Sequence, residues 1–240
     1  MKKSIVLYFG FVMSMFIGER VFAQASFTIG ASYCTFRMTD LKGLNEELSK
    51  NYNVEGKVVS SFPPYIGYDA TLSLQAKQHR IGFFWSYNST GSRVSYSDYS
   101  GSYQYDQKLS SHQVGGYYGY AVPLKNELWK LIPSLRLGLI YTDYEIKSYL
   151  KIGDQSSSEK LDFVSKSILV SPGLLLQRDF LPWLFLSADL RYLIDIPQNL
   201  VWARDHKTYL FNEQNTPLAA QWSGLRFVIS VGVKLKESAK

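Results

Sequence analysis

Three histidines and one cysteine limit the reactive chemistry that this chain of 240 residues can carry. His112 follows Ser110 and Ser111, and His206 follows Asp205, so both stand beside residue types that hydrolases use. Neighbouring side chains of a strand point to opposite faces, however, so adjacency in sequence makes no catalytic pair. The sequence contains no HExxH, no phosphate-binding glycine loop and no Cys/His cluster. We therefore predict a non-enzyme that has no catalytic residues and binds no metal and no cofactor.

Charge and cysteine content exclude two further classes. The formal net charge is +6, but the basic residues are scattered singly and no nucleic-acid motif is present, so we predict no nucleic-acid partner. Cys34 is the single cysteine, which excludes an intrachain disulfide. We expect it to be a small residue within the first strand.

The first residues have the pattern of a secretory signal peptide. Two lysines are followed by an apolar run from Ile5 to Ile17 and by small residues near a cut site at Ala23. We predict a signal peptide over 1–23 with cleavage after Ala23, and a cut after Ala25 is the alternative. The apolar run is too short to span a membrane comfortably. The mature chain, 24–240, shows no linker or change of composition and is predicted to be one exported domain.

A two-residue alternation of apolar and polar side chains dominates the mature chain. In Tyr65–Asn88 (YIGYDATLSLQAKQHRIGFFWSYN) it runs through two segments separated by a short polar turn, which predicts a β-hairpin with one apolar face. The same periodicity gives about eight strands, which we place at Ser26–Arg37, Pro64–Ala76, His79–Tyr96, Ser102–Val122, Leu128–Tyr149, Leu161–Gln177, Trp183–Leu200 and Gln221–Lys236.

The connections between these strands alternate in length. The shortest links join strands two to three, four to five and six to seven, as in outer-membrane barrels with short periplasmic turns and longer outer loops. A polar loop is expected at Lys151–Lys160. The first long connection, Met38–Pro63, contains a predicted surface helix over 39–50, with Thr39 or Asp40 as N-cap. This helix either covers the barrel mouth or binds a partner.

Charged residues recur on the face opposite the apolar one. An eight-stranded barrel encloses a bore that side chains fill, and buried charges must be paired. We predict a polar lumen in which the aspartates accept hydrogen bonds from the arginines, with water or backbone carbonyls completing the set unless some arginines lie near an opening. An anion-selective path is the alternative. The predicted lumen residues are Asp69, Arg80, Arg136, Asp189, Arg191 and Arg226.

Aromatic residues mark the strand ends and the last outer loop. Trp and Tyr near the strand ends, Trp222 among them, are expected to form girdles at the membrane interface. Trp202, Tyr209 and Phe211 in the last loop are candidate contact residues for an envelope or extracellular protein partner. Alternatively, they pack on one another in an extension of the flanking strands.

The signal segment, the alternating strands and the terminal LRFVISVGVKLK together resemble the small eight-stranded outer-membrane β-barrel proteins of Gram-negative bacteria, over residues 24–236. The resemblance implies an all-β fold, a single antiparallel up-and-down transmembrane barrel, in contact with outer-membrane lipid. One departure is that Glu237–Lys240 follow the final strand, where many family members end on an aromatic residue; Phe227 could supply an internal version. We predict a structural or interaction role. The alternatives are a narrow channel and a soluble periplasmic lipocalin-like ligand-binding barrel.

Overall fold

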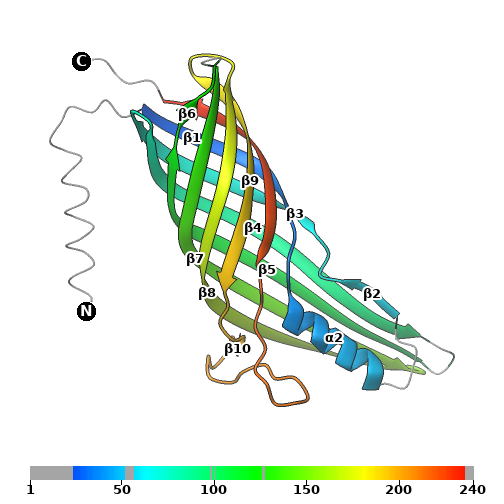
Figure 1. The fold of residues 1–240 in the computed structure, drawn as a ribbon. Coiled ribbons are helices and arrows are strands. Elements are labelled where there is room, and N and C mark those ends of the chain that lie inside the picture. Colours follow the sequence, from blue (N-terminus) through cyan, green and yellow to red (C-terminus); the bar gives the residue numbers. More distant parts are fainter. Residues whose placement is uncertain (1–23, 52–56, 98, 100, 126–127, 236–240) are drawn as a thin grey trace.

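Eight long antiparallel strands close into a barrel in the computed structural model, which describes residues 24–51, 57–97, 99, 101–125 and 128–235 (Figure 1). They are β1 (Gln24–Cys34), β3 (Tyr65–Ala76), β4 (His79–Ser97), β5 (Gly101–Tyr120), β7 (Trp129–Ile152), β8 (Gln155–Asp179), β9 (Leu184–Ile196) and β11 (Gly224–Lys234). The order is β8-β9-β11-β1-β3-β4-β5-β7, and pairing of β7 with β8 closes the ring. The predicted all-β, up-and-down barrel is therefore confirmed, whereas the predicted signal segment lies outside the described residues.

The strand register fixes the geometry of this ring. Following the paired residues from Leu176 on β8 around the barrel leads back to β8 at Lys166, ten residues away. A stagger of this size requires the strands to tilt by about 40° from the barrel axis. At this strand number the interior is just wide enough for side chains to fill it.

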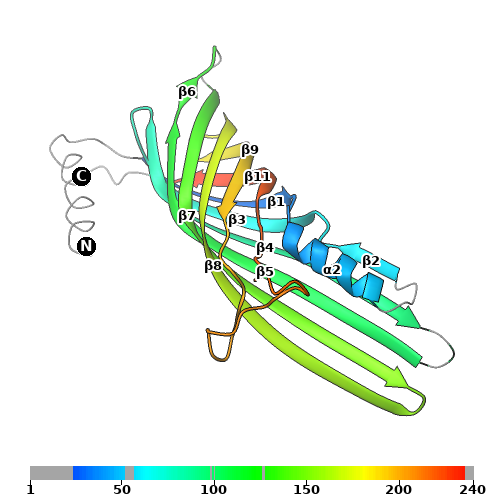
Figure 2. The same cartoon turned by 60° about the horizontal axis from the view of Figure 1, so that its bottom comes forward.

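One predicted loop is in fact continuous β-structure. The prediction of a polar loop at Lys151–Lys160 is wrong, because β7 continues to Ile152 and β8 begins at Gln155. Only the Gly153-Asp154 turn separates them, and the φ of +57° at Gly153 is a conformation that glycine adopts readily. The polar composition of this stretch indicates exposure to water, whereas its β-conformation results from the pairing of β7 with β8. The ends of β4, β5, β7 and β8 consequently extend past the remaining strands (Figure 2).

The two barrel ends differ in construction. The start of β1, the end of β11 and the short turns share one end, where Lys77-Gln78 joins β3 to β4 (Figure 1). The other end carries the helix α2 (Thr39–Asn51), the short strand β2 (Lys57–Ser61), which pairs with β4, and the last loop with β10 (Val201–Trp202), which pairs with β8. The remaining short strand, β6 (Val122–Pro123), pairs with β7 near the turn end.

The predicted helix is confirmed, and it covers the barrel mouth. Leu41 and Asn45 are fully buried on its inner face, so the helix covers an apolar cluster that includes Met38 and Trp222. Asp40, one of the two predicted N-caps, instead accepts hydrogen bonds from the last loop, 3.1 Å from the backbone nitrogen of Ala219. No described helix is long and apolar enough to cross a membrane.

Trp222 corrects one expectation about the aromatic girdle. Its side chain is fully buried inside the mouth, where the indole Nε1 donates to Thr142 Oγ1 at 2.9 Å. The ring of Phe36 contacts it edge-on, with the centroids 5.2 Å apart. Trp222 lies just before β11, in a segment whose backbone still pairs with the chain after β1, since Arg37 N donates to the carbonyl of Ser223 at 3.0 Å; the indole therefore enters the bore as an inward-facing side chain.

Replacing Leu41 by Ala should loosen α2. Removing a fully buried leucine side chain costs about 2 to 5 kcal/mol of unfolding free energy in a well-packed site. We expect faster hydrogen exchange at the α2 amides, with the barrel strands unchanged. The control is Glu46→Ala, at an exposed position of the same helix. Equal protection in Leu41→Ala and the native protein would contradict the packing of α2 on the mouth.

Candidate functional site

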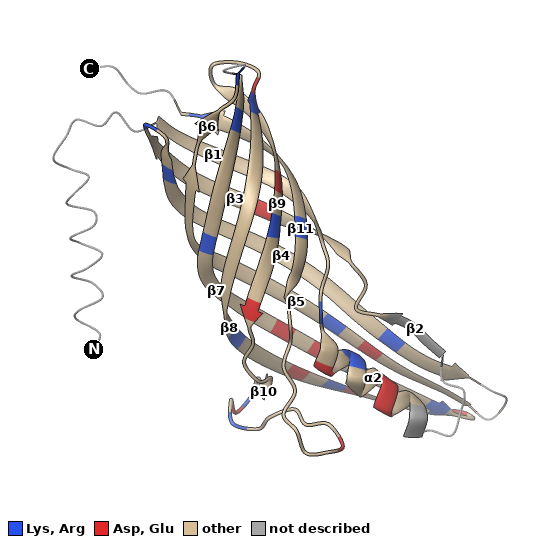
Figure 3. Cartoon of the chain, in the orientation of Figure 1, with Lys and Arg blue, Asp and Glu red and all other residues tan. Residues whose placement is uncertain are grey.

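The predicted lumen residues all point into the barrel. Asp69, Arg80, Arg136, Asp189, Arg191 and Arg226 are each no more than 5% exposed. They come from β3, β4, β7, β9 and β11, so the tertiary structure brings together side chains from five strands. Figure 3 shows charged residues spaced sparsely along the barrel wall and more closely near α2.

Asp69 is the centre of the network. Its carboxylate accepts hydrogen bonds from the hydroxyl of Ser86 at 2.6 Å, from Nη1 of Arg136 at 2.9 Å and from Nη2 of Arg191. Three donors from three other strands therefore converge on one buried acceptor. Charge-assisted hydrogen bonds of this kind compensate for the loss of hydration of both the carboxylate and the guanidinium groups.

Asp189 provides the second carboxylate of this network. Its Oδ2 lies 2.7 Å from Nη1 of Arg191 and 3.6 Å from Nη2 of Arg136. Arg136 is also held over the rings of Phe84 and Tyr117, with its Cζ 5.0 Å and 5.7 Å from their centroids. The predicted pairing of aspartate with arginine is thus confirmed for two of the four arginines.

The other two arginines bind neutral acceptors, so their predicted pairing with aspartate is wrong. Nη2 of Arg80 donates to the amide oxygens of Gln75 and Gln177, each at 3.0 Å. Arg226 donates to backbone carbonyls, at 2.7 Å for that of Trp222. Arg80 lies on the turn side of the central aspartates and Arg226 on the mouth side. The backbone carbonyls anticipated as additional acceptors are observed at Arg226.

The lumen leaves little free space around this network. A cavity of about 20 Å³ is lined by residues that include Asp69, Arg80, Arg136 and Asp189. That volume is enough for a single water molecule. Gly173 contributes to the dense packing, since a Cβ at this position would lie 2.7 Å from the Cβ of Arg191.

Sequence reasoning missed several lumen residues. Gln177, Ser86 and Asp195 are buried in the bore, and Asp195 accepts a hydrogen bond from the backbone nitrogen of Trp222 at 2.9 Å. Their position in the alternation could have revealed them, because Asp195 has the same parity along β9 as Asp189 and Arg191. Gln177 and Ser86 are neutral and therefore less conspicuous in such a pattern, whereas the charge of Asp195 makes it as recognisable as Asp189.

His79 and His112 contact aromatic side chains and not the carboxylate or serine hydroxyl that a hydrolase would need. Nδ1 of His79 lies 2.9 Å from the hydroxyl of Tyr118, and His112 stands on the outer face beside the rings of Trp85 and Tyr87. Asp205 binds its own loop, accepting from Thr208 Oγ1 at 2.6 Å and from neighbouring backbone amides. Among the described residues, no group of three or more His, Cys, Asp or Glu is arranged to hold a metal ion.

The three aromatic residues proposed as loop contacts are not equivalent. Tyr209 and Phe211 are 45% and 46% exposed, and their rings meet at 6.2 Å in an edge-to-face contact. Trp202 instead packs partly buried against the apolar cluster of the mouth, with Arg204 over its ring. The structure therefore presents Tyr209 and Phe211 to the outside and uses Trp202 to hold the loop.

The outer face of β7 shows where the apolar surface ends. Its outward residues are Leu131, Pro133, Leu135, Leu137, Leu139 and Tyr141, followed by Asp143, Glu145 and Lys147. An aromatic residue with a cation over its ring lies at each end of the apolar run: Arg178 lies 5.2 Å from the ring centroid of Trp129, and Lys166 lies 5.4 Å from that of Tyr141.

Beyond Tyr141 the outward residues Asp143, Glu145 and Lys147 are charged, and Glu145 is paired with two lysines. Glu145 lies 2.8 Å from Lys147 and 2.7 Å from Lys160. Hydrogen bonds from Lys147 and Lys160 lower the pKa of Glu145 to about 2.

The comparisons with known proteins return structural matches only. No protein-family model matches the chain, and no curated protein matches it in sequence. Among solved structures, it is similar to Ail, the attachment invasion locus protein of Yersinia pestis, with 14% identity and a TM-score of 0.36, over 89% of this chain and 99% of Ail. It is also similar to Neisserial surface protein A, NspA, with 14% identity and a TM-score of 0.38, over 88% of this chain and 97% of NspA.

A further match is Ail in complex with the heparin analogue sucrose octasulfate, with 13% identity and a TM-score of 0.32, over 89% of this chain and 99% of that one. Ail and NspA are small eight-stranded outer-membrane β-barrels of Gram-negative bacteria, the family that the sequence resembles. The eight-stranded ring of this chain is defined by its own strand pairing.

Replacing Asp69 by Ala should destabilise the barrel strongly. Arg136 and Arg191 would lose a shared acceptor, and breaking a buried ion pair from one side costs about 3 to 5 kcal/mol. Asp189→Ala should have a smaller effect in the same direction, because fewer donors converge on it. We expect a lower melting temperature and a lower temperature for the heat-induced shift in gel mobility.

The matched control is Asp106→Ala, which removes the partner of the solvent-exposed Arg93. An exposed ion pair contributes at most about 1 kcal/mol. If Asp69→Ala melted no earlier than Asp106→Ala, the lumen network would not be a stabilising element.

Proposed function

We propose that this protein is a non-enzymatic β-barrel of the Gram-negative outer membrane, with a filled lumen and an outer end that contacts other envelope or extracellular molecules. The apolar outer belt supports the membrane location. It runs on β7 from Trp129 to Tyr141, 13 residues, whose 12 steps of about 3.3 Å at a tilt of about 40° span about 30 Å along the barrel axis. That length matches the hydrocarbon thickness of a bilayer.

The distribution of polarity argues against the lipocalin-like alternative. A soluble ligand-binding barrel buries apolar side chains and presents polar ones to water. Here Leu137 is 52% exposed on the outer face, whereas its neighbour Arg136 is buried inside. An inside-out pattern of this kind is stable when lipid surrounds the barrel and the charged interior is internally paired.

The filled lumen argues against a channel, the second candidate. Charged residues give a pore selectivity only where water connects both mouths. The network around Asp69 occupies the middle of the bore, and the apolar cluster beneath α2 closes one end. Both features favour a structural or interaction role over transport.

The outer end is the proposed contact region. Tyr209 and Phe211 present adjacent exposed rings, and exposed aromatic residues often anchor protein partners. The signal segment over 1–23 is consistent with export, and we propose that the mature chain begins at Gln24.

An arginine scan of β7 tests the membrane location. Leu137→Arg should cost about 2 to 4 kcal/mol in unfolding free energy from lipid vesicles, because it places a charge near the middle of the belt. Tyr149→Arg, at an exposed outward position beyond Tyr141 on the same strand, should cost less than about 1 kcal/mol. Equal costs at the two positions would contradict a membrane boundary at Tyr141.

Fractionation and conductance test the remaining parts of the proposal. We expect detergent-dependent recovery from the outer membrane, a band that shifts on heating, and no stable conductance in a planar bilayer. Recovery from the periplasm without detergent would overturn the membrane location. A steady single-channel current would overturn the filled lumen and favour the channel.

A further inference from the structure

The neighbouring strands β8 and β9 separate near the level of Tyr141, where the apolar outer surface ends. Pairing between β8 and β9 ends at Ile168 and Ile196, and the next residue, Pro197, has no N–H with which to continue the ladder. The chain then turns away, because Leu200 bonds with the last loop through the carbonyl of Leu218 at 2.8 Å. β8 regains a partner on this side only at Val164, opposite Val201.

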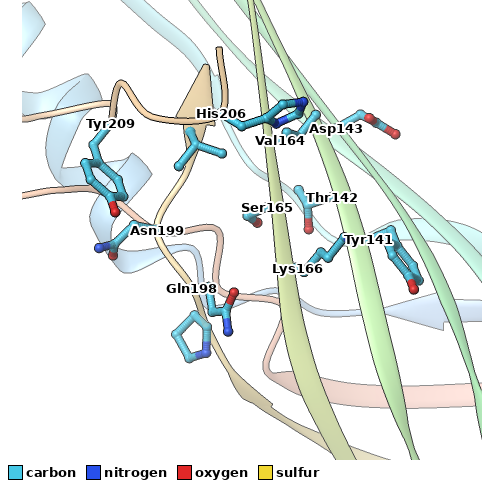
Figure 4. A pocket seen from close by; sticks show the side chains of 12 residues that line it. Tyr141, Thr142, Asp143, Val164, Ser165, Lys166, Gln198, Asn199, His206 and Tyr209 are labelled. Carbon is cyan, nitrogen blue, oxygen red and sulfur yellow. The ribbon is translucent and has the colours of Figure 1, made fainter. Parts of the chain in front are cut away.

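This parting forms a cavity of about 920 Å³ on the flank of the barrel (Figure 4). Tyr141, Asp143 and Lys166 line it from the outer faces of β7 and β8. Gln198 and Asn199 line it from the departing segment, and His206 and Tyr209 from the last loop. The volume falls within the range of small-molecule sites. Its polar groups are one lysine, one aspartate, one histidine, two amides and several hydroxyls.

The cavity lies at the level where the outer surface changes from apolar to charged. On β8 the outward residues on either side of Lys166 are the apolar Ile168 and Val164, with the charged Asp162 next, and on β7 those on either side of Tyr141 are Leu139 and Asp143. In the proposed membrane this is the headgroup level, where aromatic rings and lysines prefer to lie. A lipid whose chains run along Leu139 and Ile168 would therefore place its headgroup in the cavity.

Two charges in the cavity specify the chemistry of the headgroup. Within the described part of the chain, Lys166 and Asp143 take part in no ion pair, and Lys166 lies over the ring of Tyr141. One cation and one anion on neighbouring strands complement a ligand that carries both a phosphate and a hydrogen-bond donor. The amides of Gln198 and Asn199 add neutral donors for phosphate oxygens.

We propose that this cavity binds the phosphate-bearing headgroup of a membrane lipid. Lys166, with Gln198 and Asn199, holds the phosphate, and Asp143 accepts from an amine or hydroxyl of the same headgroup. The acyl chains lie against the apolar face formed by Leu139 and Ile168. This inference rests on the proposed membrane location and adds a specific lipid site to it.

Titration with short-chain lipids tests the site. The full mature chain, in non-ionic detergent micelles, is titrated with dihexanoyl phosphatidylethanolamine, and binding is followed by NMR shifts of the residues lining the cavity. Dihexanoyl phosphatidylcholine has the same phosphate but no ammonium N–H, so we expect weaker binding. Free phosphoethanolamine has the headgroup without chains and should bind more weakly still.

Substitutions identify the residues that bind. Lys166→Gln should weaken phosphatidylethanolamine binding about tenfold, the loss expected for one charge-assisted contact. Asp143→Asn should reduce the preference for ethanolamine over choline. The matched control is Lys108→Gln, which removes an exposed outward lysine of β5 outside the cavity and should leave binding unchanged.

Three outcomes would overturn the inference. These are no saturable shifts at the cavity, equal weakening by Lys166→Gln and Lys108→Gln, or free phosphoethanolamine binding as tightly as the lipid, which would indicate a soluble ligand. The heat-shifted gel band is recorded on the same samples. If that band is present and the titration fails, the lipid site alone is wrong; if it is absent, the proposed membrane barrel is wrong as well.

Discussion

The compensation of buried charge by Asp69 is the interaction on which the barrel interior depends. Eight strands enclose a bore too narrow for bulk water, so each guanidinium inside must find its acceptors within the protein. Asp69 supplies them to Arg136 and Arg191 at once, and Asp189 joins the same pair from β9. The network links β3, β7 and β9 across the lumen, so it ties together strands that are not neighbours in the ring.

The outer surface follows from the same alternation that fills the lumen. Because successive side chains of a strand face opposite ways, a polar interior commits the other face to apolar residues. On β7 this apolar face ends at Tyr141, and beyond it the outward residues Asp143 and Glu145 are charged. The change lies along one continuous strand, so the barrel wall itself marks the boundary between a lipid-compatible and a water-compatible surface.

The outer end is less regular than the rest, and its irregularity has a local cause. Pro197 ends the β8–β9 ladder, and the chain beyond it pairs with its own loop. That loop carries the exposed rings of Tyr209 and Phe211 and borders the flank cavity. The candidate contact surfaces therefore lie where the strand pairing of the ring stops.

The sequence by itself determined the number of strands, most of their bounds and the six charged lumen residues, because the two-residue alternation can be read within each strand separately. It also determined the helix over 39–50, whose apolar residues fall on one helical face. It could not determine which arginine meets which acceptor, since Arg80 and Gln177 are brought together only by the closure and stagger of the ring. Nor could it place Trp222 inside the mouth, continue β7 and β8 through Lys151–Lys160, or part the wall after Ile196. Those features depend on strand partners distant in sequence, so only the tertiary structure decided them.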